Sequence, residues 1–341
     1  MMVDGIKVKH TAYDDAFRTL EAECDDALIL FINAMFHEDF DNTAKIVRLR
    51  NEHFVEEKGK TDEKRITDSH FQISCHGEEK MYQLECESSG YDDSVLVRMF
   101  EYAVQAALSE KALDKRKITL HFPRSGLLVL RNKGNPPEKV TFEIRTPGGT
   151  VSYDAPVICA VDYTIEELFE RKLYFLLPFF VFQHEDRMNI YEEDEKELEN
   201  FLNIYCGIVE RLRLEDESVL SLRSKGVIIK QMEYVTKRLN VGRKKVIKKV
   251  GDIMGGKVLK MEWLERFDAA VAGGEARGEE IHLIKMICRK LRKGKNVGQI
   301  AEDLEEDEIR IKAICDMAKA FAPEYDEEQV IKAVLEPVAA R

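Results

Sequence analysis

The stretch RITDSHFQISCHGEEKMYQLECES, residues 65–88, decides the predicted fold of this chain. Its first half alternates polar and apolar side chains with the two-residue period that is typical of a half-buried strand. The alternation places Asp68 and His70 on one face and Phe71 and Ile73 on the other. We therefore predict a strand with one polar and one apolar face.

A second strand, KMYQLECES (80–88), follows after the short polar turn HGEE. Its alternation sends Leu84 to one face and Glu85 and Glu87 to the opposite face. Because the two strands are neighbours joined by a tight turn, we expect Asp68, Glu85 and Glu87 to share one polar face.

Carboxylates that converge on one face repel each other, so they must be solvated, protonated or neutralised by a cation. Oxygen ligands of this kind suit Mg²⁺ or Mn²⁺, which lower the pKa of a bound water and stabilise charge on a phosphorane-like transition state. The same pattern also fits a hairpin whose polar face is only exposed to water. Both interpretations are open on these residues alone.

Helices and further strands flank this hairpin. Helical periodicity covers Ala12–Phe36 and Ser94–Ser109, and residues 45–55 contain extended segments. Short β-branched and aromatic runs predict four more strands, at Lys117–Phe122, Leu127–Arg131, Val140–Arg145 and Pro156–Val161. The order helix, strands, helix, strands predicts an α+β core over residues 1–182.

The distribution of charged residues changes after this core. Residues 185–217 carry twelve acidic and four basic side chains, whereas residues 223–260 carry twelve basic and two acidic ones. Adjacent blocks of opposite charge fit a solvated antiparallel helical hairpin, and the basic block also fits a phosphate-binding face. We predict a charged helical region over 183–270 and, after a glycine-containing hinge, a helical C-terminal unit over 271–341.

Composition limits the possible functions. The chain has 341 residues, of which 44% are apolar, and this excludes a disordered acidic polymer. A net charge of −12 argues against a general polyanion binder, although such a sum can hide a local basic face. The seven cysteines are never closer than eleven positions, which fits reduced thiols rather than a disulfide framework or a zinc motif.

The start of the chain and its apolar stretches predict a cytoplasmic protein that does not enter a membrane. Residues 1–10 lack the apolar core of a signal peptide. The most apolar stretch, Leu173–Phe182, is ten residues long and contains Pro178, whereas a membrane span needs about 20 residues. We expect this stretch to be a buried helix end.

The chain resembles the recombination-promoting nuclease/putative transposase family of the PD-(D/E)XK nuclease superfamily. The similarity follows the order of the first 182 residues, in stretches such as YDDAFRTL (13–20), NEHF (51–54), RITDSHF (65–71), YQLECES (82–88), VRMFEYAVQAAL (97–108), FPRSGLLVLRNKGNPP (122–137) and APVICAVDYTIEELFERKLYFLLPFF (155–180). It implies a restriction-endonuclease-like core with a helical C-terminal extension. It also implies a Mg²⁺-dependent DNA endonuclease that promotes recombination or mobile-element turnover.

Carried over residue by residue, Asp68 matches the motif aspartate and Glu85 the motif glutamate, and both would be metal ligands. The next motif position holds lysine or, commonly in this family, glutamine, but here it is Glu87. Lysine would stabilise the attacking hydroxide and the developing phosphate charge, which an ionised glutamate does not do. Glu87 is thus a third ligand, a protonated neighbour, or the mark of a catalytically weakened DNA-binding or interaction protein on the same fold.

Further candidates surround the motif. Arg98, Tyr102 and Gln105 share one helical face, and Arg98 and Gln105 are candidates for DNA phosphate contacts. His70 could act as a base, and Glu52 could extend the acidic site, although a surface carboxylate is the default. In the basic block, the candidate DNA-binding residues are Arg243, Lys244, Lys245, Lys248 and Lys249.

The C-terminal segment 296–314 has the apolar spacing of a helix-turn-helix, but its turn is acidic. We therefore expect a plain helical hairpin there and expect the basic block to supply most DNA affinity. The expected partner is DNA, with a homo-oligomer left open. A structural adaptor, as a further alternative, requires the carboxylate pattern at 65–88 to be accidental.

Overall fold

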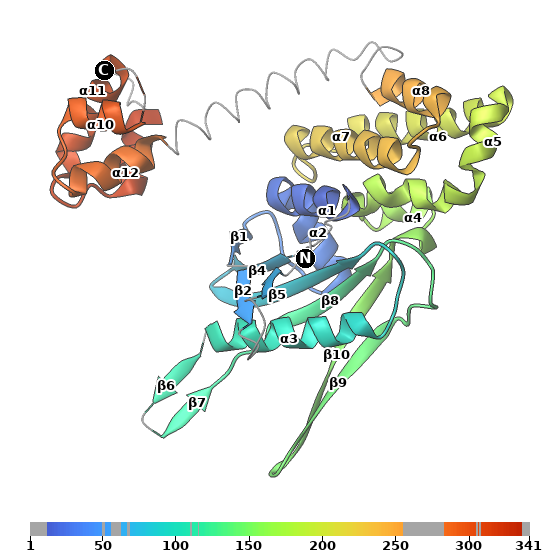
Figure 1. The fold of residues 1–341 in the computed structure, drawn as a ribbon, viewed down its shortest axis with the longest axis horizontal. Coiled ribbons are helices and arrows are strands. Elements are labelled where there is room, and N and C mark those ends of the chain that lie inside the picture. Colours follow the sequence, from blue (N-terminus) through green and yellow to red (C-terminus); the bar gives the residue numbers. More distant parts are fainter. Residues whose placement is uncertain are drawn as a thin grey trace, which may run out of the picture. The chain divides into compact units, whose positions relative to one another are not determined.

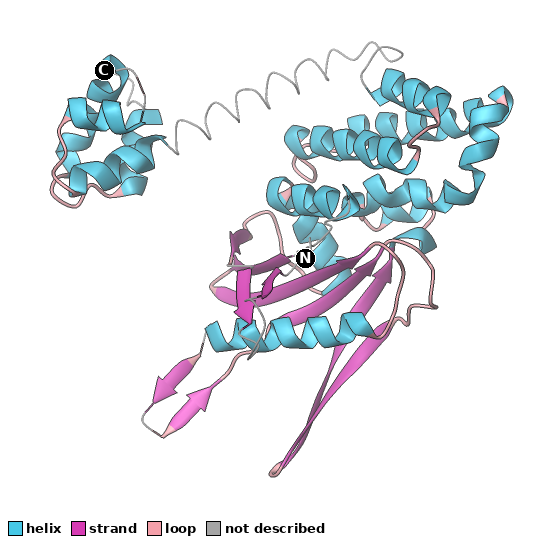
Figure 2. Cartoon of the chain, viewed as in Figure 1, coloured by secondary structure: helices cyan, strands magenta, loops and turns pink. Residues whose placement is uncertain are grey.

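The computed structural model describes residues 12–254 and 283–335, except for 50–51, 56–62, 67–68, 110, 115, 305 and 307. The chain divides into two compact units, Met1–Met261 and Glu262–Arg341. The first unit is a mixed α+β structure built on a six-stranded sheet, and the second is helical (Figures 1 and 2). The coarse fold class predicted from the sequence is therefore confirmed.

The six-stranded sheet has the order β1-β4-β5-β8-β10-β9. Its members are β1 (Lys45–Arg48), β4 (Ser69–Cys75), β5 (Glu78–Glu87), β8 (Arg124–Val129), β9 (Lys139–Thr146) and β10 (Gly149–Cys159). β5 pairs with β8 and β8 with β10 in parallel, while the pairs β1–β4, β4–β5 and β9–β10 are antiparallel. Within 65–88, residues Ser69–Cys75 and Glu78–Glu87 thus form two adjacent strands of this sheet, whereas Arg65 and Ile66, predicted to begin the first of them, belong to β3 (Glu63–Ile66) of a separate sheet.

The parallel step from β5 to β8 needs a crossover, which α3 (Ser94–Ser109) supplies. The helix has the bounds predicted from its apolar periodicity. A small hairpin, β6 (Ala112–Asp114) with β7 (Lys117–Thr119), follows before β8 begins. β2 (Glu52–Val55) and β3 (Glu63–Ile66) form a separate two-stranded sheet.

One strand is longer than predicted. The sequence pattern indicated Pro156–Val161, whereas β10 begins at Gly149 and pairs with β9 from Thr146 onward. The reason is the TPGG turn, which closes a hairpin and lets both strands extend to it. In the outer half of β10, Thr150, Ser152 and Asp154 alternate with Val151, Tyr153 and Ala155, a strand pattern that the predicted bounds left out.

The predicted helix Ala12–Phe36 is in fact two helices, α1 (Ala12–Glu23) and α2 (Asp25–Phe36). The break lies at Cys24, whose φ of −121° and ψ of 65° are not helical. Asp25 and Asp26 then occupy the first turn of α2, where carboxylates interact favourably with the helix dipole. The apolar spacing continues across the break, so periodicity alone merged the two helices.

α2 packs on the apolar face of the sheet. Phe71 and Tyr82 lie opposite each other in the β4–β5 ladder, and their rings stack at 5.8 Å. Phe36 of α2 contacts the Tyr82 ring at 5.1 Å. A Cβ atom on Gly126 of β8 would meet the Met35 sulfur at 2.5 Å, so α2 lies directly against the strand.

A helical layer completes the first unit. It comprises η1 (Ala160–Asp162), α4 (Ile165–Glu170), η2 (Tyr174–Arg187), α5 (Met188–Glu193), α6 (Glu195–Leu214), α7 (Leu222–Leu239) and α8 (Lys244–Met254). The apolar stretch Leu173–Phe182 is buried, and the rings of Phe17, Phe31 and Phe175 pack together there. The prediction of a buried helical segment is confirmed, with 3-10 geometry around Pro178.

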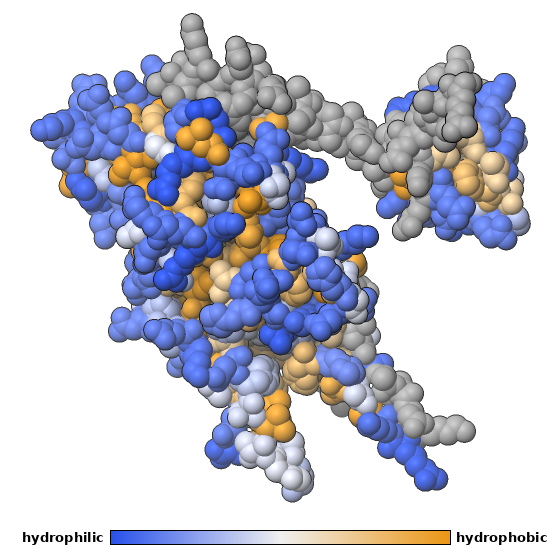
Figure 3. Space-filling model, turned by 180° about the vertical axis from the view of Figure 1, so that it is seen from behind, coloured by the Kyte–Doolittle hydropathy of each residue, from blue (hydrophilic) through white to orange (hydrophobic). Residues whose placement is uncertain are grey.

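On the face of the first unit that Figure 3 shows, hydrophilic side chains predominate and apolar side chains gather in patches between them. Among the described residues, no helix has the length and apolar character that a membrane span requires.

The second unit has its own small core. Residues 283–292 are helical and are followed by α10 (Val297–Leu304), α11 (Glu308–Ala318), η3 (Lys319–Phe321) and α12 (Glu327–Leu335). Ile284, Ile300, Ile311 and Val330 are buried together. α10 and α11 contain most of the segment predicted as a helical pair, so that prediction is confirmed.

Candidate active site and basic face

The polar residues of β5 lie on one face of the sheet. His70 of β4 pairs across the ladder with Gln83, and directly opposed residues share a face. Because side chains alternate along β5, Glu85 and Glu87 lie on the same face as Gln83. The described members of the predicted polar face therefore do lie together.

α3 covers this polar face. The Gln83 side chain donates a hydrogen bond to the backbone carbonyl of Met99 in α3 at 3.2 Å. Leu127 of β8, the ladder partner of Glu85, packs in an apolar cluster with Val95 and Met99. Figure 1 shows α3 lying across β5 and β8, so the face of β5 that carries Glu85 lies beneath this helix and beside the apolar cluster.

Glu85 is only 2% exposed. The alternative of a hairpin whose carboxylates are only exposed to water therefore does not fit Glu85, because α3 covers it. Burying a carboxylate is costly unless charges or hydrogen bonds compensate for the lost water. Arg98 of α3 supplies part of this compensation, since its charge interacts with the charges of Glu85 and Glu87.

Arg98 and Glu87 form an ion pair of 3.0 Å that joins α3 to β5. The Glu87 side chain is 13% exposed and also accepts hydrogen bonds from the backbone and hydroxyl of Ser89. Burial lowers the pKa of Arg98, but the hydrogen bond to Glu87 and the nearby carboxylates outweigh burial and raise it. The Arg98 guanidinium, which was predicted to bind DNA phosphate, therefore pairs with the Glu87 carboxylate.

The other predicted residues are placed as follows. Asp68 lies outside the described residues, and so does the side chain of Glu52. His70 is 4% exposed and interacts with its surroundings. Tyr102 is buried at 6% exposure, and Gln105 is half-buried on α3. The structure thus groups His70, Gln83, Glu85, Glu87 and Arg98 between the sheet and α3.

The basic block forms a second candidate surface. In α8, Val246, Val250 and Ile253 are buried, whereas Lys244, Lys248 and Lys249 are exposed on the other side of the helix. In the part of the chain that the structure describes, no ion pair involves these three ammonium groups. Free ammonium groups on one helix face are suited to bind phosphate.

The acidic block forms hydrogen bonds with the start of α8 and with the residue before it. Glu192 of α5 accepts hydrogen bonds from the backbone N–H groups of Lys245 and Val246, at 3.1 and 3.0 Å. Burial raises the pKa of Glu192, but these N–H groups and the nearby cations lower it overall. Arg243 donates to the Asn189 amide oxygen at 2.9 Å. Contacts with the acidic block therefore hold the helix start and Arg243, but leave the exposed lysines available.

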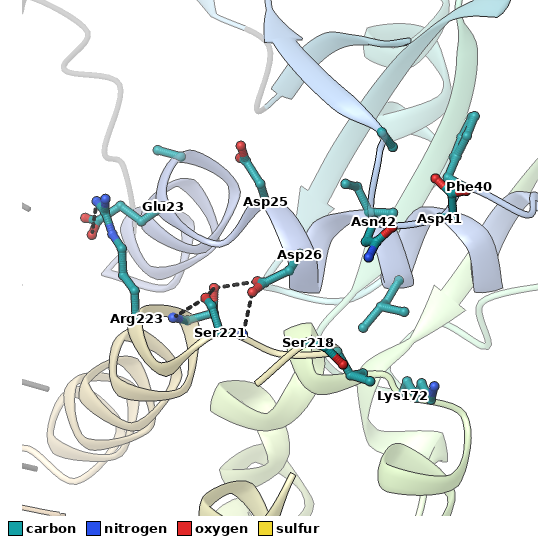
Figure 4. Close-up of a pocket in the computed structure, with 16 residues that line it drawn as sticks. Glu23, Asp25, Asp26, Phe40, Asp41, Asn42, Lys172, Ser218, Ser221 and Arg223 are labelled. Carbon is teal, nitrogen blue, oxygen red and sulfur yellow. Dashed lines mark hydrogen bonds and ion pairs between the residues drawn. The ribbon is translucent and has the colours of Figure 1, made fainter. Parts of the chain in front are cut away.

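A cavity of about 660 Å³ lies between α2 and the start of α7 (Figure 4). Asp26 points across this cavity. Its carboxylate accepts one hydrogen bond from the Ser221 backbone at 2.7 Å and another from the Ser224 hydroxyl. Arg223 faces Glu23 at 3.6 Å. The carboxylate of Asp26 thus joins α2 to α7, which sequence patterns do not indicate.

A third group of polar residues lies at the turn between β4 and β5. One donor atom each from Asp41, Cys75 and His76 lies within 4.8 Å of the other two. Cys75 and His76 are adjacent in the sequence, but Asp41 is too distant for a recognised metal-binding spacing. Local motifs therefore gave no signal for this group.

Comparison of the chain with models of known protein families, with curated proteins and with solved structures finds no match.

Proposed function

We propose that this chain is a cytoplasmic, divalent-metal-dependent DNA endonuclease with a PD-(D/E)XK-like core, in which Asp68 and Glu85 hold Mg²⁺ or Mn²⁺. One observation carries the proposal: Glu85 and Glu87 lie on the sheet face beneath α3, with the Arg98 charge beside them. The β4–β5 hairpin, the α3 crossover and the parallel strand β8 support it, because a carboxylate-bearing hairpin is what the resemblance implies.

The donor set fits the chemistry, since two carboxylates are the hard oxygen ligands that Mg²⁺ prefers. A bound metal would lower the pKa of a water molecule and stabilise the developing phosphate charge. Arg98 places a permanent positive charge beside Glu87, which partly replaces the charge that a motif lysine would supply.

α8 is the proposed source of DNA affinity. Its exposed lysines offer a phosphate-binding face, and Figure 1 shows α8 and α3 in different layers of the first unit. Because the two features are separate, substitutions in α8 should weaken DNA binding without changing the carboxylates. The proposal includes that DNA cleavage by this protein promotes recombination or mobile-element turnover.

A catalytically weakened DNA-binding protein on the same fold is the second candidate. The 2% exposure of Glu85 favours it, because a metal ligand must reach its ion and substrate. The Glu87–Arg98 pair favours it too, since a guanidinium held by a carboxylate is less available to phosphate.

Plasmid cleavage with Mg²⁺, Mn²⁺ or EDTA, run beside DNA binding at two salt concentrations, separates the candidates. The endonuclease predicts cleavage that EDTA stops, that Glu85→Gln abolishes and that Glu79→Gln retains, because Glu79 is an exposed residue near the start of the same strand. Salt-sensitive binding without cleavage supports the second candidate. Absence of both activities rules out both.

A further inference from the structure

The turn between β4 and β5 brings together three different metal-binding atoms. The His76 Nε2 atom lies 2.8 Å from Asp41 Oδ2, and the Cys75 sulfur lies 3.6 Å from Asp41 Oδ1. All three donors are within 4.8 Å of one another. The group thus combines a thiol, an imidazole and a carboxylate at ligand spacing.

The backbone explains why these residues meet. β4 ends at Cys75, and His76 and Gly77 adopt left-handed φ values of 51° and 84° in the turn. β1 pairs with β4 so that Lys45 lies opposite Ser74, which brings the loop before β1 to the same end of the sheet. Asp41 belongs to that loop.

Asp41 is held in place before any ligand arrives. Its Oδ1 atom accepts hydrogen bonds from the Thr43 backbone and hydroxyl, at 2.9 and 2.6 Å. The Thr43 hydroxyl also lies 3.7 Å from the Cys75 sulfur. Hydrogen bonds of this kind orient metal-binding side chains in known sites.

We propose that Asp41, Cys75 and His76 bind one Zn²⁺ ion or an ion of similar character. Sulfur and imidazole ligands favour zinc over Mg²⁺, which prefers oxygen. Tetrahedral zinc with usual bond lengths places its sulfur and oxygen ligands about 3.5 Å apart, close to the distance between Cys75 and Asp41. Three protein ligands leave a fourth position for water or a small ligand.

The proposed site is accessible. The His76 and Asp41 side chains are 70% and 47% exposed, while Cys75 is buried at 7% beneath them. Asp41 also lines the cavity beside α2 (Figure 4), so an ion held here would adjoin that space. The turn is seven residues along β5 from Glu85, roughly 23 Å in an extended strand, so this site is distinct from the proposed nuclease centre.

Titration of the full-length chain with Co²⁺, which replaces zinc and is visible spectroscopically, tests the proposal. We expect one Co²⁺ per chain with a sulfur-to-cobalt charge-transfer band, displaced by Zn²⁺ but not by excess Mg²⁺. Cys75→Ser should remove the band, and Asp41→Asn and His76→Asn should each weaken binding at least about tenfold.

The controls are Cys206, a half-buried cysteine outside the site, and His37, another histidine with a left-handed backbone. Cys206→Ser and His37→Asn should both retain the band. Circular dichroism verifies that each variant is folded, and slower alkylation of Cys75 in the presence of Zn²⁺ gives a second measure. No binding, or a band that survives Cys75→Ser in folded protein, overturns the proposal. Glu85→Gln should leave the Co²⁺ spectrum unchanged, which keeps this test separate from that of the nuclease.

Discussion

Replacing Arg98 with methionine tests whether the ion pair with Glu87 holds α3 against β5. The pair is 3.0 Å long, with side chains 39% and 13% exposed, so it lies between a surface pair and a buried one. Surface pairs contribute about 0–1 kcal/mol, and breaking a buried pair costs about 3–5 kcal/mol. We therefore expect Arg98→Met to lower the free energy of unfolding by about 2 kcal/mol.

Most of this loss should come from the Glu87 carboxylate, which is left without its cation next to the buried Glu85. The double variant Arg98→Met/Glu87→Gln should recover at least about half of the loss, because it removes the unpaired charge. Urea unfolding of the full chain, followed by near-ultraviolet circular dichroism of the buried aromatic side chains, measures each term.

The matched control is Arg145→Met, which breaks an exposed pair with Glu143 at 2.7 Å. The Arg145 side chain is 82% exposed, so the loss there should stay below about 0.5 kcal/mol. If Arg98→Met costs no more than this control, or if Glu87→Gln gives no recovery, the pair does not stabilise the site and the reasoning about Arg98 is wrong.

Three further predictions follow from other features. If the proposed nuclease site is correct, Glu87→Gln should raise the cleavage rate, because it introduces the residue common in the family that the chain resembles and removes a negative charge beside Glu85. If metal binding and cleavage are lost together, Glu87 is a ligand instead. DNA binding measured across a salt series should weaken and lose salt dependence when five charges are neutralised together, at Arg243, Lys244, Lys245, Lys248 and Lys249. Deletion of residues 279–341 should leave DNA binding largely intact. The reverse result would mean that the C-terminal unit binds the DNA. Burial, together with the charge of Arg187, lowers the pKa of His184 to about 4. Between about pH 4 and 6.5 the unfolded chain therefore binds a proton that the folded chain does not. The free energy of unfolding should rise with pH through that window, by about 1–2 kcal/mol after solvent screening. Unfolding measured at several pH values should show His184→Gln flattening this rise, and an unchanged slope contradicts the assignment.

Patterns with a strong period were predictable from the sequence. The alternation in 65–88 identified β4 and β5, although it placed the start of the first strand at Arg65, which belongs to β3, and the apolar spacing of Ser94–Ser109 gave α3 with its observed bounds. Both succeed because the apolar side chains that pack against the core lie on one face, and one face recurs with the period of the strand or helix. Where burial continues smoothly across a backbone break, as at Cys24, periodicity cannot mark the break.

The environment of the candidate site was less predictable. Alternation correctly placed Glu85 and Glu87 on one face, but it could not show that α3 covers this face and buries Glu85. The partner of Glu87 was likewise hidden, since Arg98 reaches it only through the packing of α3 on β5. The Asp41–Cys75–His76 group depends on the pairing of β1 with β4, which no local spacing encodes.

The most direct test of the central proposal compares Mg²⁺-dependent cleavage of a supercoiled plasmid by the unmodified chain and by Glu85→Gln, purified in the same way. The proposal predicts nicked or linear product from the unmodified chain and a loss of at least about a hundredfold in Glu85→Gln, which keeps the shape of the side chain but removes its charge. Equal cleavage by the two proteins, or none by the unmodified chain with either Mg²⁺ or Mn²⁺, would contradict it.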